Sequence, residues 1–196
     1  MIKVHTLPAF NDNYLWLFHL EGSSDAYVVD PGDANVVIEA LRDLSLELSG
    51  ILITHHHGDH TGGIGALLEH KAVPVYGPDS ANIPQITQTF RQGEVLELAP
   101  NLKFDVLEVP GHTLDHIAWF CNTQALSHPQ APLLFCGDTL FAGGCGRLFE
   151  GSPSQMLDSL SKLAALPSDT AVHCAHEYTL ANLAFAQAAD PENEVL

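Results

Sequence analysis

The sequence predicts an α/β protein in which two sheets pack face to face with helices on the outside. Apolar, β-branched runs typical of buried strands alternate with segments whose apolar residues recur at helical spacing. Four strand-like runs end at residue types that bind metals, at positions 55–60, 112, 138 and 176. Because strand ends are where such folds assemble their sites, we expect these residues to meet.

Length, charge and cysteine content limit the class of protein. The chain has 196 residues, 46% of them hydrophobic, which is enough for one sizeable core. Its formal net charge is −17, so we expect neither nucleic acid nor an anionic membrane as a partner. The sequence shows no signal peptide and no apolar run of membrane-spanning length. The four cysteines form no C-x-x-C pair, so we expect a reduced, cytoplasmic protein.

Apolar or alternating runs bounded by turn residues are interpreted as strands. In chain order they are residues 1–7, 13–20, 25–30, 51–53, 73–76, 95–98, 102–109, 116–121, 133–136 and 171–174. The polar stretch 79–92, rich in Gln and Thr, is interpreted as a connection, and residues 122–132 as a surface loop.

Helices are expected where apolar residues recur every three or four positions. The first begins after Asp33, which can cap it, and Ser49-Gly50 would close it. A short helix opens near Ile64. Another begins at 152–155 with a Ser N-cap, a Pro and a Gln that can complete a capping box, and the last covers 178–189. The expected inward residues are Val37, Ile38, Leu41 and Leu44 in the first helix and Met156, Leu157, Leu160 and Leu163 in the third.

The strand 51–53 ends at the strongest functional signal in the sequence. Four histidines and an aspartate lie within six positions, namely His55, His56, His57, Asp59 and His60. In an extended segment His55 and His57 point one way and His56 the other. Asp59 and His60 lie past the bend at Gly58. Imidazole and carboxylate suit zinc, iron and manganese, so we interpret the loop as two metal half-sites rather than a polar surface loop.

Three further motifs accompany this loop, Pro110-Gly111-His112-Thr113, Gly137-Asp138-Thr139 and the isolated His176. Together with Thr54–His60 they resemble the metal signature of the metallo-β-lactamase superfamily. Within it, residues 141–151 and 175–179 resemble glyoxalase II, the hydroxyacylglutathione hydrolase family, in its bacterial form. The resemblance implies an αββα sandwich of the metallo-β-lactamase type with a two-metal site.

Carried over by motif, the resemblance implies two divalent metal ions, which we expect to be zinc, with iron or manganese as alternatives. The implied ligands are His55, His57 and His112 for one ion, Asp59, His60 and His176 for the other, and Asp138 as a bridge. A hydroxide bridging both ions would attack a thioester carbonyl, with Asp59 and Asp138 as the catalytic carboxylates. A thiolate leaves as a group with a pKa of about 8.5 and needs no dedicated acid.

The implied substrate is a small-molecule glutathione thioester, S-D-lactoylglutathione, hydrolysed to D-lactate and glutathione. Arg147 matches the family's basic residue against glutathione, and Tyr178 matches its substrate-facing tyrosine. A solvated surface arginine and a core-packed tyrosine are the structural alternatives. We expect residues 1–189 to form the catalytic domain of a monomer. Residues 190–196 would be a remnant where the family's C-terminal helical segment begins, in a truncated or naturally short chain, leaving Arg147 as the obvious glutathione anchor.

Several nearby residues have plain structural interpretations. His116 is expected to be structural, and His56 to point away from the metals and support the loop. Asp115 is either a carboxylate behind a histidine ligand or a charged turn residue. The segment 11–13 matches the family, and turn formation is its simpler explanation. Cys145 is not needed as a nucleophile beside a metal-activated water.

Other functions remain compatible with the same motifs. Within the fold they are a broader metallo-thioesterase or lactonase, a β-lactamase, which should carry an export signal, and a sulfur dioxygenase, which uses one iron. From a different class, the chain could be a catalytically silent metal-binding or partner-binding domain, because a grafted site rather than the fold decides function. Such a domain would bind metal without turnover.

Overall fold

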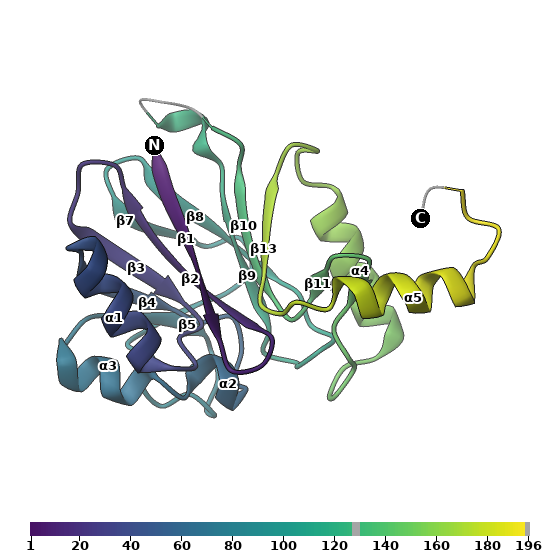
Figure 1. Cartoon of the computed structure of the whole chain (residues 1–196), viewed down its shortest axis with the longest axis horizontal. Helices are drawn as coiled ribbons and strands as arrows, with labels where there is room; N and C mark the ends of the chain where they lie inside the picture. The colour runs from purple at the N-terminus through teal and green to yellow at the C-terminus, as the bar shows by residue number, and fades with distance from the viewer. Residues whose placement is uncertain (127–129, 195–196) are drawn as a thin grey trace.

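Two mixed sheets lie face to face at the centre of the protein, a computed structural model that describes residues 1–126 and 130–194 (Figure 1). The first sheet has the order β1 (Ile2–Ala9), β2 (Asn13–Leu20), β3 (Asp25–Val29), β4 (Glu47–Leu52), β5 (Val75–Pro78) and β6 (Gln88–Phe90). The second has the order β13 (Ala171–Cys174), β10 (Leu133–Gly137), β9 (Ile117–Cys121), β8 (Leu102–Glu108) and β7 (Val95–Ala99). The expected αββα sandwich is confirmed.

Helices cover the outer faces of both sheets. The helices α1 (Ala34–Leu44) and α3 (Ile64–His70) pack on the first sheet, and α4 (Pro153–Ala164) packs on the second (Figure 1). Between the sheets, the rings of Phe18, Phe104 and Phe135 lie 5.4 to 6.1 Å apart, centroid to centroid. This apolar layer fixes the spacing of the two sheets and therefore of the loops at their edges.

The loops that follow β4, β8, β10 and β13 meet at one edge of the sandwich. The first of these continues into the single-turn helix α2 (Gly58–Thr61). The hairpin of β11 (Leu140–Phe141) and β12 (Gly144–Cys145) follows β10 and borders the same edge. Four of the predicted strand ends are thereby brought together, as the polar residues behind each strand indicated.

The predicted end of the first helix and the predicted start of the next strand, at residue 51, are both wrong. The helix ends at Leu44, because Ser45 adopts a left-handed conformation with φ 56°, so the predicted closure at Ser49-Gly50 does not occur. These residues lie inside β4 instead. A Cβ on Gly50 would lie 3.0 Å from the ring of Tyr76 and 3.1 Å from that of Tyr27, so this glycine allows close packing within the sheet and does not mark a turn.

Other differences concern short elements and inward faces. The short strand β6 and the 3₁₀ turn Thr123–Ala125 lie in stretches that were expected to be irregular. The capping box of Ser152 and Gln155 is confirmed, but Leu157 of α4 is exposed, as is Leu44 of α1. Amphipathic spacing identified both helices correctly but overestimated the width of their buried faces.

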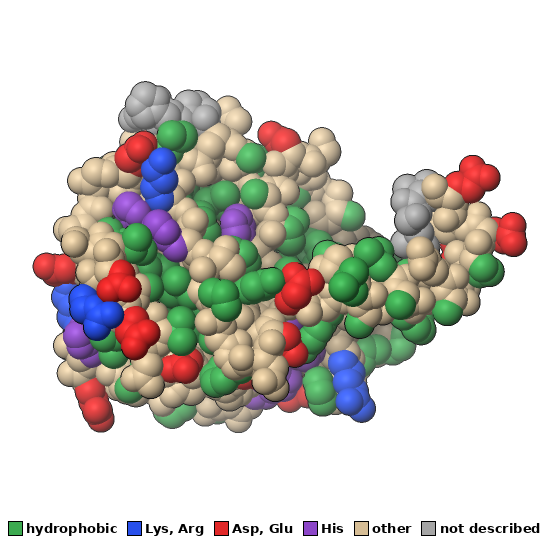
Figure 2. Space-filling view, in the orientation of Figure 1, with side chains coloured by type: hydrophobic (Ala, Val, Ile, Leu, Met, Phe, Trp, Pro, Cys, Tyr) green, Lys and Arg blue, Asp and Glu red, His purple; other side chains and the backbone are tan. Residues whose placement is uncertain are grey.

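The last helix, α5 (Thr179–Ala189), projects from the body of the protein (Figures 1 and 2). It contains no charged residue and none of its residues is buried. Residues 190–194 form neither helix nor strand, and Val195 and Leu196 lie outside the described residues, so the remnant assigned to 190–196 stays a prediction. Across the two described ranges, every helix is too short or too polar to span a lipid bilayer.

Candidate active site

The loop after β4 is anchored by a carboxylate at the end of the neighbouring strand β3. Asp30 is buried and accepts hydrogen bonds from the Thr54 amide at 2.8 Å and from the Thr54 hydroxyl at 2.7 Å. On the other side, the Thr54 carbonyl accepts from the amide of Ile117, the first residue of β9. The loop is therefore held by both sheets at the residue before its first histidine.

Three histidine nitrogens and one carboxylate oxygen converge in a first group. His57 Nδ1 lies 3.1 Å from His55 Nε2 and 2.9 Å from His112 Nε2. The His112 Nε2 atom is 3.2 Å from Asp138 Oδ2. The sequence places these residues in three separate loops, and the fold brings all four together.

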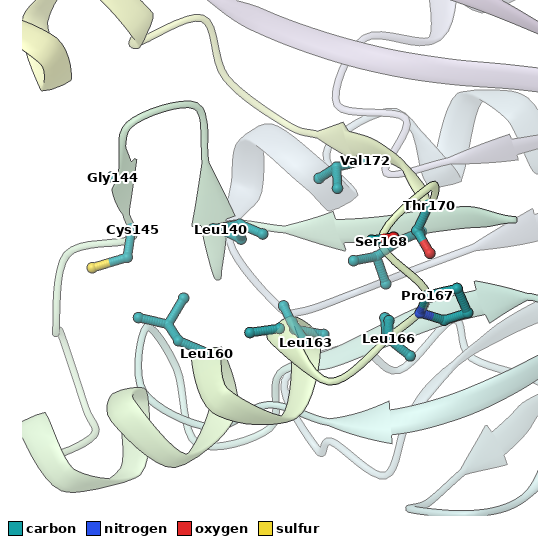
Figure 3. A pocket seen from close by; sticks show the side chains of 12 residues that line it. Leu140, Gly144, Cys145, Leu160, Leu163, Leu166, Pro167, Ser168, Thr170 and Val172 are labelled. Atoms are coloured by element: carbon teal, nitrogen blue, oxygen red, sulfur yellow. The ribbon is translucent and has the colours of Figure 1, made fainter. Parts of the chain in front are cut away.

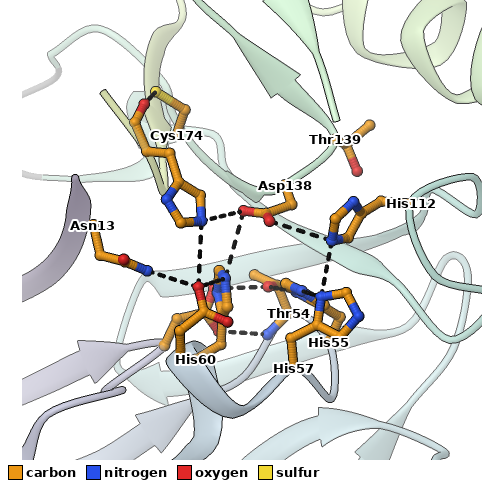
Figure 4. A network of polar contacts seen from close by, with 12 residues as sticks. Asn13, Thr54, His55, His57, His60, His112, Asp138, Thr139 and Cys174 are labelled. Atoms are coloured by element: carbon orange, nitrogen blue, oxygen red, sulfur yellow. Dashed lines mark hydrogen bonds and ion pairs between the residues drawn. The ribbon is translucent and has the colours of Figure 1, made fainter. Parts of the chain in front are cut away.

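A second group lies on the other side of Asp138. His176 Nε2 is 3.3 Å from Asp138 Oδ1 and 3.4 Å from Asp59 Oδ2. His60 Nε2 is 3.5 Å and 3.4 Å from the same two oxygens. Each oxygen of Asp138 thus faces a different group, so one carboxylate is placed to join two sites (Figure 4).

The unsatisfied atoms of these residues fit metal ions. His60 Nε2 and Asp138 Oδ1 are buried without a hydrogen-bond partner, a costly arrangement unless a cation binds there. Nitrogen pairs at hydrogen-bond distance point at one another in the first group, where an ion would satisfy all of them. The donor set of imidazoles and carboxylates suits zinc, iron or manganese.

Hydrogen bonds on the outer ring nitrogens of four of the five candidate histidines fix which nitrogen faces inward, whereas His57 faces the first group through Nδ1. The Nδ1 atoms of the four donate to oxygen atoms, and the pairs are His55 to Thr54 Oγ1, His60 to Asp30, His112 to the Arg147 carbonyl and His176 to Asp12. In each of these rings Nε2 is left as the lone-pair donor for a metal. Asn13 Nδ2 donates to Asp59 Oδ2 at 2.9 Å and orients that carboxylate.

Sequence reasoning missed three of these supporting residues. Asp12 and Asn13 lie at a turn, as expected, but their side chains also orient His176 and Asp59, so turn formation alone does not explain them. Asp30 was assigned only to the end of a strand. Its position directly behind an apolar strand is the same signal that pointed to the candidate ligands.

His116 is structural, as expected, and it holds the backbone of Asp138 in place. Its Nδ1 donates to the Ile117 carbonyl and its Nε2 accepts from the Asp138 amide at 3.1 Å. Burial lowers the pKa of His116 to about 3, so the ring stays neutral and keeps this acceptor. The residue before Asp138, Gly137, has φ 48° and lies close to Thr54, so that a Cβ on it would clash with Thr54 Oγ1. Only glycine fits this approach.

In the metal-free protein, the histidines of the two groups differ in their pKa values. In the first group, burial lowers the pKa values of His55, His57 and His112. In the second, burial would also lower them, but hydrogen bonds to carboxylates raise the pKa of His60 well above its usual range and that of His176 to about 10. The second group therefore holds protons that a metal ion would have to displace.

A cavity of about 360 Å³ opens over the centre. The two predicted substrate residues lie on different parts of its wall. The Arg147 guanidinium carbon is 5.1 Å from the ring centroid of Phe149, and the Tyr178 ring stacks on His176 at 5.0 Å. The phenol of Tyr178 lies at the exposed pocket wall and not in the core, which contradicts the structural alternative.

A larger cavity of about 570 Å³ is lined by residues of the β11–β12 hairpin, of α4 and of β13 (Figure 3). Its lining is mainly aliphatic, with Leu140, Leu163 and Val172 among the side chains that point into it. It contains no carboxylate or histidine, so the smaller, polar cavity over the two ligand groups is the candidate active site.

Comparison with known proteins agrees with this geometry. The family model of the metallo-beta-lactamase superfamily matches residues 14–176. A hydroxyacylglutathione hydrolase of Hahella chejuensis is 53% identical over 194 residues, which cover 99% of this chain and 73% of that protein. The crystal structure of ETHE1 from Myxococcus xanthus has a TM-score of 0.76 at 31% identity, covering 90% of this chain and 76% of that one.

A second solved structure, that of TTHA1623 in a di-iron-bound form, is 28% identical with a TM-score of 0.70 and covers 99% of this chain and all of that one. The matched range of the family model contains all seven candidate ligands and Arg147, and it ends two residues before Tyr178. The chain therefore belongs to the metallo-β-lactamase superfamily and, within it, to the hydroxyacylglutathione hydrolase family.

Proposed function

We propose that this enzyme hydrolyses S-D-lactoylglutathione to D-lactate and glutathione. The observation that carries the proposal is the pair of ligand groups on either side of Asp138, below a cavity whose wall includes the positively charged side chain of Arg147. The Hahella chejuensis relative, which covers nearly the whole chain, is a hydroxyacylglutathione hydrolase and supports the same reaction. We further propose that residues 1–189 act as one catalytic domain.

Two divalent ions bound in these groups, zinc in our proposal, would supply a bridging hydroxide at neutral pH and polarise the thioester carbonyl. The chain's own contribution is to orient the ligands. Asp138 spans both groups, while Asp59 and His57 close them from the loop side. Thiolate departure needs no protein acid, because the pKa of a thiol is about 8.5. Iron remains an alternative, as the di-iron form of TTHA1623 illustrates.

Recognition of the glutathione part is assigned to Arg147 and Tyr178. Arg147 is exposed at the cavity wall in a chain with only seven Lys and Arg residues, so an anionic substrate meets its positive charge there. Burial and the nearby carboxylate of Asp12 raise the pKa of Tyr178, so its hydroxyl keeps its proton and can donate to the substrate.

A broader metallo-thioesterase is the second candidate. It is favoured by one observation, namely that Arg147 is the single Lys or Arg among the residues that line the described cavity. One cation provides limited discrimination between a glutathione thioester and a simple one.

Parallel kinetics would separate the two candidates. S-D-lactoylglutathione and a thioester without carboxylates are assayed with metal content measured on the same sample, using Asp138→Ala as the inactive control. We expect two metals per chain, preference for the glutathione substrate, and a roughly tenfold loss of that preference in Arg147→Met. Equal turnover of both substrates would favour the broader thioesterase, and two bound metals without turnover would contradict the enzyme assignment. A cytoplasmic monomer remains our prediction, and light scattering tests its oligomeric state.

A further inference from the structure

His56 lies between two candidate ligands but its ring faces away from both groups. Its Nδ1 is 2.9 and 2.8 Å from the two oxygens of Asp115, and its Nε2 is 3.4 Å from Glu150 Oε1. The side chains of His56 and Asp115 are 17% and 13% exposed, so this contact is largely screened from water. Sequence reasoning placed Asp115 behind a metal ligand or in a turn. The structure has it in a bend of the chain, with its carboxylate against His56, which is not a candidate ligand.

These three residues connect three separate loops. His56 belongs to the ligand loop after β4, Asp115 to the loop between β8 and β9, and Glu150 to the segment 146–151 that precedes α4. The carboxylates of Asp115 and Glu150 also accept hydrogen bonds from the loop between β8 and β9, here called the middle loop. Thr113 Oγ1 donates to Asp115 at 2.6 Å, and the Leu114 amide donates to Glu150 Oε2 at 2.8 Å.

The segment 146–151 carries the cavity wall formed by Arg147 and Phe149. Its backbone is bonded to the middle loop, because the amides of Phe149 and Glu150 donate to the His112 carbonyl at 3.2 and 3.4 Å. The Arg147 carbonyl in turn accepts from His112 Nδ1 at 2.8 Å. The contact of Glu150 with His56 adds a direct connection from this wall to the ligand loop.

We propose that His56, Asp115 and Glu150 form a clamp that positions the Arg147–Phe149 wall over the metal centre and so sets the affinity for the charged end of the substrate. The clamp residues are positioning residues, since none of them lines the cavity over the centre. The contacts alone support the positioning of the wall. The effect on substrate affinity rests on the proposed function.

A third metal site is the rival explanation for the same cluster. Asp115 and Glu150 face opposite nitrogens of the His56 ring, whereas an imidazole binds an ion through one nitrogen in the ring plane. Both carboxylates are already engaged by donors from the middle loop. Hydrogen bonding therefore accounts for the arrangement without an ion.

The test compares metal-loaded Asp115→Asn and Glu150→Gln with wild type and with the control Asp105→Asn, an exposed aspartate on β8. Glu150 is exposed, so its variant is expected to fold even if Asp115→Asn does not. We expect amide exchange in the peptide containing residues 146–151 to become about tenfold faster in both variants. We expect KM for the glutathione thioester to rise about tenfold, with kcat within about twofold and two metals retained.

Unchanged amide exchange in 146–151 would overturn the clamp. So would a parallel loss of kcat and bound metal, which would indicate a role in the ligand loop itself. A third metal equivalent that disappears in Asp115→Asn would replace the clamp by a metal site. If wild type does not hydrolyse the thioester, the proposed function fails, and the exchange rates alone decide whether the clamp exists. Faster exchange with an unchanged KM would overturn the claim on substrate affinity.

Discussion

His176 and helix α5 are three residues apart in the chain and are held in very different ways. His176 is 6% exposed, its ring is bonded to Asp12, and it forms a β-bridge with Asn13. Helix α5 contacts the β11–β12 hairpin, where the Asn182 side chain donates to the Ala142 carbonyl, but buries no residue. Hydrogen bonds to its neighbours hold His176 in place, whereas helix α5 depends on helix propensity and local contacts.

The largest expected effect is at the residue shared by both ligand groups. Asp138→Ala removes the carboxylate that faces both sites, so we expect kcat to fall by at least about 10³-fold. Steady-state kinetics with metal analysis measures this, and Asp105→Ala is the matched exposed control. Residual activity within tenfold of wild type would show that Asp138 is not a shared ligand.

A supporting carboxylate should have a smaller effect than a ligand. Asp30→Asn weakens the contacts with His60 Nδ1 and the Thr54 hydroxyl, so we expect metal affinity to drop roughly 10- to 100-fold. Competition with a chromogenic chelator measures the affinity, and Asp43→Asn on the exposed face of α1 is the control. Equal affinities for the two variants would contradict the role assigned to Asp30.

Metal binding should release protons from the second group. The raised pKa of His176, about 10, makes its ring protonated in the metal-free protein at pH 7, and a ligand must be neutral. Affinity is therefore expected to fall as pH is lowered from 10 towards 7. In the metal-free protein, the stability that this proton provides is complete below about pH 6.5, the ordinary histidine pKa, and is lost as pH rises through 10.

Calorimetry of zinc binding in two buffers of different ionisation enthalpy counts the released protons. We expect His176→Ala to release about one proton fewer than wild type at pH 7.5. The same count in both proteins would show that His176 is already neutral before metal binds, and His173→Ala serves as the control for removing a histidine outside both groups.

The smallest effect is expected on α5. Leu180 and Phe185 are 84% and 73% exposed, so replacing both with Ser should change the free energy of unfolding by about 0.5 kcal/mol per site or less. The buried Leu163→Ala on α4 should cost about 2–5 kcal/mol. Urea unfolding measures both, and a large loss in the α5 variant would mean that the helix is packed in solution.

These contrasts explain what the sequence could predict. The seven candidate ligands, which the fold brings together in two groups, could be predicted because histidine and aspartate behind apolar strands carry a chemical signal that is readable without a structure. Supporting residues such as Asp12 and Asp30 were missed, because their role depends on which loops become neighbours. The short strand β6 and the exposure of Leu157 were missed for the same reason, since tertiary contacts decide them.

The origin of the ligands has a consequence for the life of the protein in a cell. His55, His57, Asp59 and His60 follow a strand of the first sheet, and the remaining three candidates follow strands of the second. Bound ions would tie the two halves of the sandwich together, and this cross-link cannot form in an unfolded chain. Metal supply would then govern the protein's resistance to proteolysis as well as its catalysis, so that chains without metal are removed faster than loaded ones.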